Sequence, residues 1–321
     1  MSRLAVIAIG RNEGARLVRC LASLGQIRPV IYVDSGSTDG SVAAARAAGA
    51  HVVELAPERP FTAARARAEG FAALQALEPV EYVFFVDGDC EILPGWLEAG
   101  MAALDAAPEL GLVTGWRAEA HPDASIYNAL CDFEWHRPAG PITTCGGDMM
   151  VRARAYEAAG GFDPQVIAAE DDEFCLRLGK AGWRLERLPV AMTRHDAAMT
   201  RFSQWWRRAV RSGHGFAQVG ALHPEFFRPE RRRVWIYGLI LPLILMAGLL
   251  WSGWIVAAVL GLYALSYGRT VEGLIRAGLP PGKALHQGVF LSLSKFPNLV
   301  GMFTYYLRKA RRADMRIIEY K

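Results

Sequence analysis

The sequence predicts an α/β domain, with a mostly parallel sheet covered by helices on both faces, followed by transmembrane or interfacial helices near the C-terminus. Two observations predict this arrangement. Apolar runs of strand length alternate with segments of helical periodicity through residues 4–106, which is typical of a parallel sheet with crossover helices. Residues 234–268 contain no charged side chain, although charged residues make up 21% of the chain.

The elements of the first half follow from these runs and spacings. Leu17, Leu21 and Leu24, for example, lie on one face of a helix. Strands are expected at 4–9, 30–33, 51–55 and 82–86, and helices at 16–24, from the turn at Gly40 to Ala48, at 62–77 and at 96–106.

The second half of the domain is less regular. Between residues 111 and 150 only two short segments look like strands. The expected elements are strands at 112–116, 148–152 and 183–188, a helix at 170–180 and a basic amphipathic helix at 204–219.

Composition restricts the class of protein. The net charge is +4, and the five cysteines are scattered without any Cys-x-x-Cys pair, so neither a disulfide framework nor a zinc site is indicated and a reducing compartment is expected. The apolar stretch at the N-terminus is too short for a secretory signal and is expected to form the first strand. We expect no nucleic-acid partner.

The charge-free segment 234–268 is long enough for two short spans of about 17 residues each. Trp251 and Trp254 would lie in the turn between the spans, at an interface where tryptophan is enriched. One long tilted helix, or a hydrophobic hairpin buried in a soluble domain, are the alternatives. A charge-free run of this length is rare in a soluble core, so we expect membrane insertion.

A second apolar stretch, 285–307, is interrupted by Lys295 and Pro297. It is expected to be an amphipathic or re-entrant segment that lies at the membrane interface, because three full spans would place the basic tail outside the cytoplasm. The expected division is therefore a domain at 1–225 and a membrane-associated region at 226–321, with the first domain in the cytoplasm at a bacterial inner membrane.

Asp87-Gly88-Asp89 ends the apolar run 82–86. In α/β sheets ligands bind at the carboxyl ends of the strands, and hard carboxylate oxygens suit Mg²⁺ or Mn²⁺, which in turn bind substrate phosphates. The same tripeptide also forms ordinary turns. A divalent metal site is the functional interpretation of this triplet.

Three further polar segments stand at comparable positions. Asn12-Glu13 follows the first strand, Asp34 begins a run of turn residues after the second, and the acidic run 170–173 opens a helix. Each has a structural explanation, because turn residues cap helices and acids are favoured at helix N-termini. Four acids in series nevertheless exceed what capping requires, and one of them can act as a general base.

In this order the motifs resemble family 2 glycosyltransferases of the GT-A fold, over residues 3–220. The stretches that carry the resemblance are Ile9–Gly14, Val33–Gly40, Phe85–Asp89, Gly160–Asp163 and Glu170–Asp172. Some family features are absent. Ser35 stands where many relatives have an aspartate, Ala68 replaces a usual asparagine, and the Gln-x-x-Arg-Trp order of processive synthases is not kept near Gln204. Single transfer is therefore favoured over processive synthesis.

The resemblance implies roles for individual residues. The catalytic residues would be Asp171, as general base, with Glu170 beside it, and the metal ligands would be Asp89 and His195. The nucleotide-sugar would contact Asn12, Glu13, Asp34, Arg67 and Asp87.

Contacts to an acceptor or to phosphate are expected from Gly146, Gly147, Asp172, Arg207 and Arg211. Glycine lets a ligand approach the backbone closely. Arg207 and Arg211 lie one helical turn apart and would share a face, where they would engage a diphosphate or lipid phosphate, or only anionic headgroups.

The expected activity is inverting transfer of a sugar from a nucleotide-diphosphate sugar to a lipid-linked or membrane-proximal glycan acceptor, in exopolysaccharide, lipopolysaccharide or glycolipid synthesis, with a divalent metal as cofactor. A homo-oligomer and polysaccharide-assembly partners are further expectations. Three alternatives remain at this point: a polyprenyl-phosphate glycosyltransferase, a nucleotidyltransferase, and a non-catalytic membrane scaffold. The scaffold leaves the ordered acidic motifs unexplained.

Overall fold

The computed structural model describes residues 2–319, which form two compact units. Unit 1 comprises the chain up to Thr200 together with Met315–Ile317, and unit 2 comprises Arg201–Asp314 with residues 318–319. The sequence-based division after residue 225 stays a proposal.

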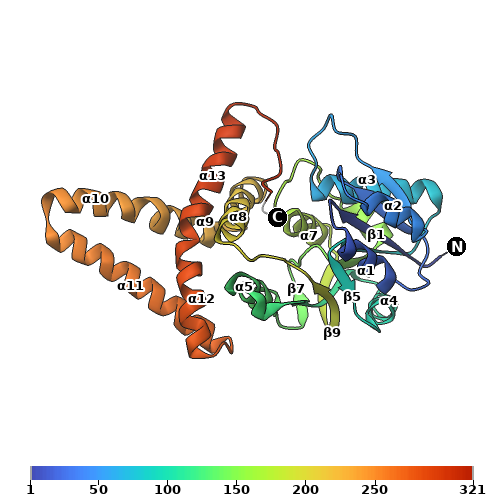
Figure 1. Ribbon diagram of the computed structural model, residues 1–321, viewed down its shortest axis with the longest axis horizontal. Helices are drawn as coiled ribbons and strands as arrows, with labels where there is room; N and C mark the ends of the chain where they lie inside the picture. Colours follow the sequence, from blue (N-terminus) through green and yellow to red (C-terminus); the bar gives the residue numbers. More distant parts are fainter. Residues whose placement is uncertain (1, 320–321) are drawn as a thin grey trace. The chain divides into compact units, whose positions relative to one another are not determined.

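Unit 1 is built on one mixed sheet (Figure 1). Along the sheet the order is β3-β2-β1-β4-β8-β6-β9-β5, and β7 pairs with β9. The strands are β1 (Leu4–Gly10), β2 (Val30–Asp34), β3 (His51–Glu54), β4 (Tyr82–Asp87), β5 (Cys90–Ile92), β6 (Leu110–Glu119), β7 (Gly140–Ile142), β8 (Met149–Arg152) and β9 (Arg184–His195). Strands β3, β2, β1 and β4 are all parallel, whereas β8 is antiparallel to both β4 and β6.

The helices of unit 1 begin where side chains can cap them. The hydroxyls of Thr62 and Ser125 each accept a hydrogen bond from a backbone N–H three residues later, which satisfies a donor that the helix leaves unpaired. The helices are α1 (Ala15–Ser23), α2 (Ser41–Ala47), α3 (Ala63–Leu77), α4 (Trp96–Ala106), the 3₁₀ turn η1 (Pro122–Ala124), α5 (Ile126–Trp135), α6 (Ala153–Ala158) and α7 (Glu170–Lys180).

Two hydrophobic cores lie on opposite faces of this sheet. Because strand side chains alternate between faces, Val6 and Ala8 of β1 point to one core and Ala5 and Ile7 point to the other. The first core is closed by α1, α2 and α4, and the second by α3, α6 and α7. Both faces of the central strands are therefore buried, as the continuous apolar runs predict.

The expected α/β architecture is confirmed, with three differences of detail. Strand β9 runs to His195 rather than ending near residue 188. Its pairing with β6 shifts register around Pro189, so the N–H group that proline lacks is not needed for a hydrogen bond between the strands. Strands β5 and β7 have three residues each, too few to give a periodic signal. Helix α5 carries mixed polar and apolar residues and was not expected from the sequence.

Unit 2 is helical. Its elements are α8 (Phe202–Leu222), α9 (Arg228–Trp235), the π-helical turn η2 (Ile236–Ile240), α10 (Leu241–Trp251), α11 (Gly253–Arg276), α12 (Pro281–Leu293) and α13 (Lys295–Ala310). Helix α10 ends at Trp251, and the extended residue Ser252 lies within the turn predicted between Trp251 and Trp254. The apolar stretch 285–307 forms parts of two helices, which meet at Ser294 and Lys295.

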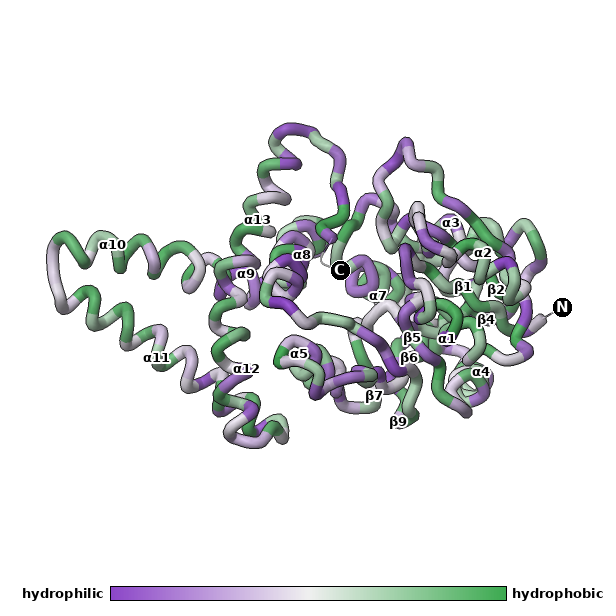
Figure 2. The backbone as a smooth tube through the Cα atoms, viewed as in Figure 1, coloured by the Kyte–Doolittle hydropathy of each residue, from purple (hydrophilic) through white to green (hydrophobic). Residues whose placement is uncertain are grey.

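The two arms of the hairpin expose mainly apolar side chains. Residues Arg228–Trp251 and Gly253–Arg276 are continuous helical segments of 24 residues each, and both are long and apolar enough to cross a membrane. Figure 2 shows hydrophobic residues along much of α10 and α11. Trp251 and Trp254 are 82% and 86% exposed, so nothing among residues 2–319 covers these two side chains. These properties agree with the predicted hairpin.

Candidate active site

The candidate site lies at the carboxyl ends of the parallel strands. In the register of the sheet, Ile9 is paired with Asp87 and Gly10 with Asp34, so the polar residues that follow β1, β2 and β4 reach the same edge. This edge is where open α/β sheets bind ligands. The ordering of the motifs in the sequence thus corresponds to a single place in the fold.

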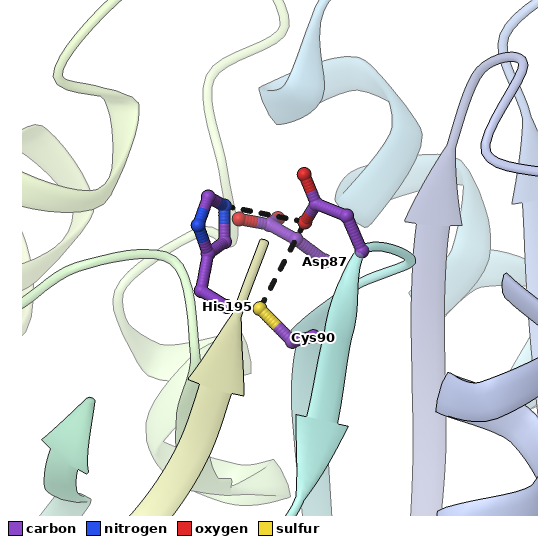
Figure 3. Close-up of side chains that lie close together, drawn as sticks. Asp87, Cys90 and His195 are labelled. Carbon is purple, nitrogen blue, oxygen red and sulfur yellow. Dashed lines mark hydrogen bonds and ion pairs between the residues drawn. The ribbon is translucent and has the colours of Figure 1, made fainter. Parts of the chain in front are cut away.

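Four side chains that can ligate a metal converge at this edge. Asp87, Asp89, Cys90 and His195 each offer a ligand atom within 4.8 Å of the others. In Figure 3 the labelled Asp87, Cys90 and His195 approach one another from β4, β5 and β9. Antiparallel pairing of β5 with β9 places Cys90 opposite His195 and so brings the histidine, more than 100 residues away in sequence, to the Asp-Gly-Asp turn.

The donor set fits a divalent cation of the Mg²⁺ or Mn²⁺ type. Carboxylate oxygens suit both ions, and an imidazole nitrogen suits the transition metal. Cys90 is the weakest of the four candidate ligands. Burial raises the pKa of its thiol, which donates to Asp148 Oδ2 at 3.3 Å instead of ionising. Asp89 and His195, the two predicted ligands, lie together with Asp87 in this cluster.

His195 lies between two buried carboxylates. Its Nε2 is 3.3 Å from Asp89 Oδ1, and its Nδ1 is 3.9 Å from Glu119 Oε2. Burial alone lowers the pKa of His195, but the nearby Asp89 carboxylate outweighs it and the net shift is upwards. The ring also meets the edge of Trp135, with centroids 4.7 Å apart. The 3.9 Å separation from Glu119 is too long for a hydrogen bond, so this carboxylate acts on the ring through its charge.

Arg67 joins the metal cluster to the acidic helix. Its Nη2 donates to Asp87 Oδ1 at 2.7 Å, and its Nη1 donates to Glu170 Oε1 at 2.8 Å. The side chain is 2% exposed, and these two carboxylates raise its pKa despite the cost of burial. A Cβ atom on Gly147 would lie 2.2 Å from Nη2, so only glycine leaves room for the guanidinium. The structure thus places Gly147 against Arg67.

A second arginine, Arg117 of β6, binds the other side of Asp87. Its Nη2 lies 3.2 Å from Asp87 Oδ2, and its Nε donates to Asp148 Oδ2 at 2.9 Å. Asp148 is 1% exposed and also accepts from Thr193 Oγ1 at 2.7 Å. Asp87 is therefore held between two guanidinium groups, which lower its pKa although burial opposes ionisation.

The start of α7 concentrates negative charge. Glu170 is buried, and Asp171 and Asp172 are half-buried. Burial, followed by repulsion from Glu170 and Asp172, raises the pKa of Asp171 well above its ordinary value. Burial also raises the pKa of Asp172, to about 6. A carboxylate with a raised pKa is a better proton acceptor near neutral pH, which is what a general base requires.

The predicted nucleotide-contacting residues lie in the loops after β1 and β2. Asn12, at a φ of 55°, accepts from Thr38 N at 2.7 Å through its Oδ1 and so ties the two loops together. Asp34 Oδ2 accepts from the backbone N–H of Gly36 and Ser37. Glu13 is half-buried and pairs with Arg16 at 2.8 Å. These contacts shape the loops, and nucleotide binding by the three predicted residues stays a proposal.

The remaining predicted contacts divide between the units. Gly146 and Asp172 lie in unit 1, where a Cβ on Gly146 would be 4.0 Å from Asp171 Oδ2. Arg207 and Arg211 lie on α8 in unit 2, the first exposed and the second half-buried. Their roles stay predictions.

Sequence reasoning did not identify the roles of Arg117, Asp148, Glu119 and Cys90. Asp148 directly follows Gly146 and Gly147, which were expected to contact the acceptor, and a lone acid after two glycines was the available signal. Arg117 and Glu119 are charged residues at the end of a strand whose first half is buried. That change of character within β6 is the signal that marks the second half as part of a site.

Comparison with known proteins gives consistent matches. The model of "Glycosyl transferase family 2" matches residues 5–155, and that of "Glycosyl transferase family group 2" matches residues 82–271. The chain is 31% identical over 232 residues to a pre-mycofactocin glycosyltransferase of Mycobacterium tuberculosis, covering 68% of this chain and 48% of that protein. It therefore spans about half the length of that curated relative.

Two further proteins are similar. An N-acetylglucosaminyl-diphospho-decaprenol L-rhamnosyltransferase of Mycobacterium tuberculosis is 28% identical over 269 residues, covering 65% of this chain and 88% of that protein. The solved structure of a mannosyltransferase from Pyrobaculum calidifontis, in complex with GDP-Man and Mn²⁺, matches with a TM-score of 0.54 and 21% identity, covering 97% of this chain and 86% of that one. This structural likeness shows a shared fold.

Proposed function

The chain belongs to glycosyltransferase family 2, and from that premise we propose that it moves a sugar from a nucleoside-diphosphate sugar to a lipid-linked or membrane-proximal glycan acceptor. One observation carries this proposal. Arg67 binds both Asp87, in the cluster of candidate metal ligands, and Glu170, beside the candidate base Asp171. A donor-binding group and an acceptor-activating group are thereby held at fixed positions, as a transfer between two substrates requires.

Asp89 and His195, with Asp87, would hold the divalent ion. Bound there, the ion would neutralise the charge that develops on the departing nucleoside diphosphate. The relative from Pyrobaculum calidifontis, in complex with Mn²⁺ and GDP-Man, supports this choice of cofactor and donor class. Asn12, Glu13 and Asp34 lie in the loops beside the cluster, and we assign them to the nucleoside.

Asp171 would act as the general base. It takes the proton of the acceptor hydroxyl while that oxygen attacks the anomeric carbon, and the bond from this carbon to the diphosphate oxygen breaks, with inversion. The raised pKa of Asp171 makes it a competent acceptor of that proton. Its half-buried position leaves one side open to a substrate. Asp172 and the glycines at 146 and 147 border the same region and would contact the acceptor.

The acceptor is proposed to be membrane-bound. The rhamnosyltransferase relative is named for a diphospho-decaprenol substrate, which is a lipid-linked one. The two 24-residue apolar helices of unit 2 would anchor this chain to the membrane that holds such an acceptor, a bacterial inner membrane with the active site in the cytoplasm. Arg207 and Arg211 would bind phosphate groups of the lipid substrate or of the headgroups.

The test compares two acid-to-amide variants of the full chain in detergent. Asp171→Asn should lose transfer by about 100-fold or more, the usual contribution of a general base, while it retains metal-dependent binding of the donor. Asp89→Asn should lose metal-dependent donor binding itself. Asp105→Asn, an acid of α4 that pairs with Arg3, is the matched control and should transfer normally.

The two variants also separate the acceptor classes. If Asp171→Asn transfers at the wild-type rate while Asp89→Asn is inactive, the acceptor is a phosphate that needs no strong base, as in a polyprenyl-phosphate glycosyltransferase. If both variants transfer normally, the site assigned here is wrong.

A further inference from the structure

Arg117 is held in one orientation by groups on three sides. Its Nε and Nη2 lie 2.9 and 2.7 Å from Asp148 Oδ2, and its Nη2 also approaches Asp87 Oδ2 at 3.2 Å. The Cζ atom of the guanidinium lies over the ring of Trp135, 5.2 Å from its centroid. A side chain fixed in this way loses little further conformational freedom when it binds a ligand.

One end of this guanidinium is not used by the protein. Among residues 2–319, no hydrogen bond is made by Nη1 of Arg117. It faces the loop at Gly146, where an added Cβ would be 3.9 Å away. The side chain is 14% exposed, so a ligand can reach it. Gly146 also lies near Asp171, which places the unused donor between the metal cluster and the candidate base.

A diphosphate at this acidic site needs a positively charged side chain in addition to a metal ion. Asp87, Asp89 and Glu170 lie at the same edge, and these carboxylates repel a diphosphate that enters among them. A single divalent ion compensates only part of this negative charge. Arg67 is not placed to supply the rest, because its Nη1 and Nη2 both bind carboxylates, its Nε, unpartnered among the described residues, is buried, and the side chain is only 2% exposed. Arg117 differs from Arg67 because its Nη1, unpartnered among residues 2–319, belongs to a side chain that is 14% exposed and so within reach of a ligand.

Resting on the proposed function, we propose that Arg117 is a binding residue for the diphosphate of the donor and that its Nη1 donates to a phosphate oxygen. Asp148 then acts as the positioning residue that holds the guanidinium, through a carboxylate that Thr193 also fixes. The fork geometry of arginine is required, since a lysine ammonium cannot bind Asp148, Asp87 and a phosphate at these separations at once. The contact is charge-assisted and strengthens as charge builds on the leaving group.

The experiment measures nucleotide affinity rather than activity. Full-length protein in detergent is titrated with UDP, GDP, UMP and GMP in the presence of Mn²⁺, by calorimetry. In the wild-type protein the diphosphate of the preferred nucleoside should bind more tightly than the monophosphate. In Arg117→Lys that preference should fall about tenfold, while affinity for the monophosphate stays the same. A residue with a merely structural role would weaken both ligands together.

Arg152→Lys is the matched control. Arg152 is a half-buried arginine of β8 whose guanidinium binds the backbone carbonyl oxygens of Leu104 and Leu110, away from the site. It should lose some thermal stability and keep the wild-type preference for diphosphate. An undiminished preference in Arg117→Lys would overturn the inference and leave the proposed function standing. Titration with dTDP extends the panel to a third nucleoside. If the wild-type protein binds neither the four nucleotides nor dTDP, the proposed function fails, and the inference fails with it.

A measurement on the wild-type protein covers the case in which Arg117 variants do not fold. Phenylglyoxal reacts with accessible guanidinium groups, and the modified peptide is quantified by mass spectrometry. The diphosphate should protect Arg117 more than the monophosphate does at equal occupancy. Equal protection by the two nucleotides would contradict a contact with the second phosphate.

Discussion

Gly147 illustrates how a single residue determines the geometry of this site. Gly147→Ala would place a methyl group 2.2 Å from Arg67 Nη2, and the guanidinium would have to leave Asp87, Glu170 or both. Overpacking and an unpaired buried carboxylate together should lower the free energy of unfolding by about 2–4 kcal/mol. Chemical denaturation measures this loss. Gly146→Ala is the control, since its nearest neighbours would be 3.9 Å away, and it should stay within about 0.5 kcal/mol of wild type.

Asp172 should show that the acidic helix start is unfavourable for folding. The pKa of Asp172 in the folded protein is about 6, above the ordinary 3.8, so the folded state favours the protonated form. The ionised carboxylate therefore destabilises the fold above pH 6, and this cost disappears as the pH falls from 6 to below 4. Because the side chain is half-buried, Asp172→Asn should stabilise the protein by only about 1–2 kcal/mol at pH 7.5, and by nothing at pH 3.5.

Urea unfolding of the wild-type protein and of Asp172→Asn at pH 7.5 and at pH 3.5 tests the direction of this change in stability. Glu58→Gln, which removes an exposed carboxylate from the loop after β3, is the control and should give a difference near zero at both. A destabilised Asp172→Asn at pH 7.5 would contradict the conclusion that this carboxylate is ionised at a cost to folding, chiefly through burial. Groups held at such a cost are common at functional sites.

Of the individual residues, the acids at the strand ends could be predicted from the sequence, whereas the contacts of the arginines could not. Asp87, Asp89 and Asp34 each follow an apolar run, and this local pattern predicts their place at the strand ends. Arg117 and Asp148 are 31 residues apart, and their pairing depends on β6 and β8 lying side by side. No local spacing encodes that contact. His195 reaches the site for the same reason, through the pairing of β5 with β9.

At the scale of elements, α8 and α13 depend on close approach between their backbones. A Cβ on Gly301 would lie 1.9 Å from Val210 O, and one on Gly213 would lie 2.0 Å from Asn298 O. Gly301→Ala should therefore separate the two helices and destabilise unit 2 by about 2–4 kcal/mol, as overpacked contacts do.

Thermal unfolding in detergent measures the change. Gly261→Ala on α11 is the matched control, because nothing lies within 4 Å of its added Cβ. It should unfold at or slightly above the wild-type temperature, since alanine favours helix more than glycine does. Equal effects of the two substitutions would mean that α8 and α13 do not pack through their glycines.

The elements themselves were predictable where their patterns were long. The strands β1 to β4 and the helices between them follow from apolar runs and helical spacing. The three-residue strands β5 and β7 exist because β9 offers an unpaired edge, which is a property of the assembled sheet rather than of their own sequences. Helix α5 mixes polar and apolar residues because part of it faces the site through Trp135 and part packs on β6.

At the scale of the whole molecule, charge divides with the two units. Residues 1–200 contain 27 acidic and 18 basic side chains, whereas residues 201–314 contain 16 basic and 4 acidic ones. The basic segment 201–314 also contains the two apolar helical segments of the hairpin. Positive charge beside apolar helices is what the cytoplasmic side of an anionic membrane attracts. The full chain should therefore remain in the membrane fraction after alkaline carbonate extraction.

The double variant Ile244→Arg with Leu260→Arg should release the chain from membranes. Both side chains are apolar and exposed within the chain, on α10 and α11, and each arginine costs about 2.5–3.5 kcal/mol in a membrane span. Leu77→Arg, a change at an exposed leucine of α3, should leave extraction unchanged. A wild-type chain released by carbonate, or a double variant that resists it, would contradict membrane insertion of the hairpin.

The central claim is that the edge of the sheet formed by Asp87, Asp89, His195 and Asp171 transfers a sugar from a nucleoside diphosphate to an acceptor hydroxyl. Product analysis by nuclear magnetic resonance tests it most directly, with purified chain, Mn²⁺, a panel of nucleotide-sugars and bacterial lipid extract. The account predicts a nucleoside diphosphate and a glycoside of inverted anomeric configuration, both absent with Asp89→Asn. Release of pyrophosphate, or a product that Asp89→Asn forms equally well, would contradict it.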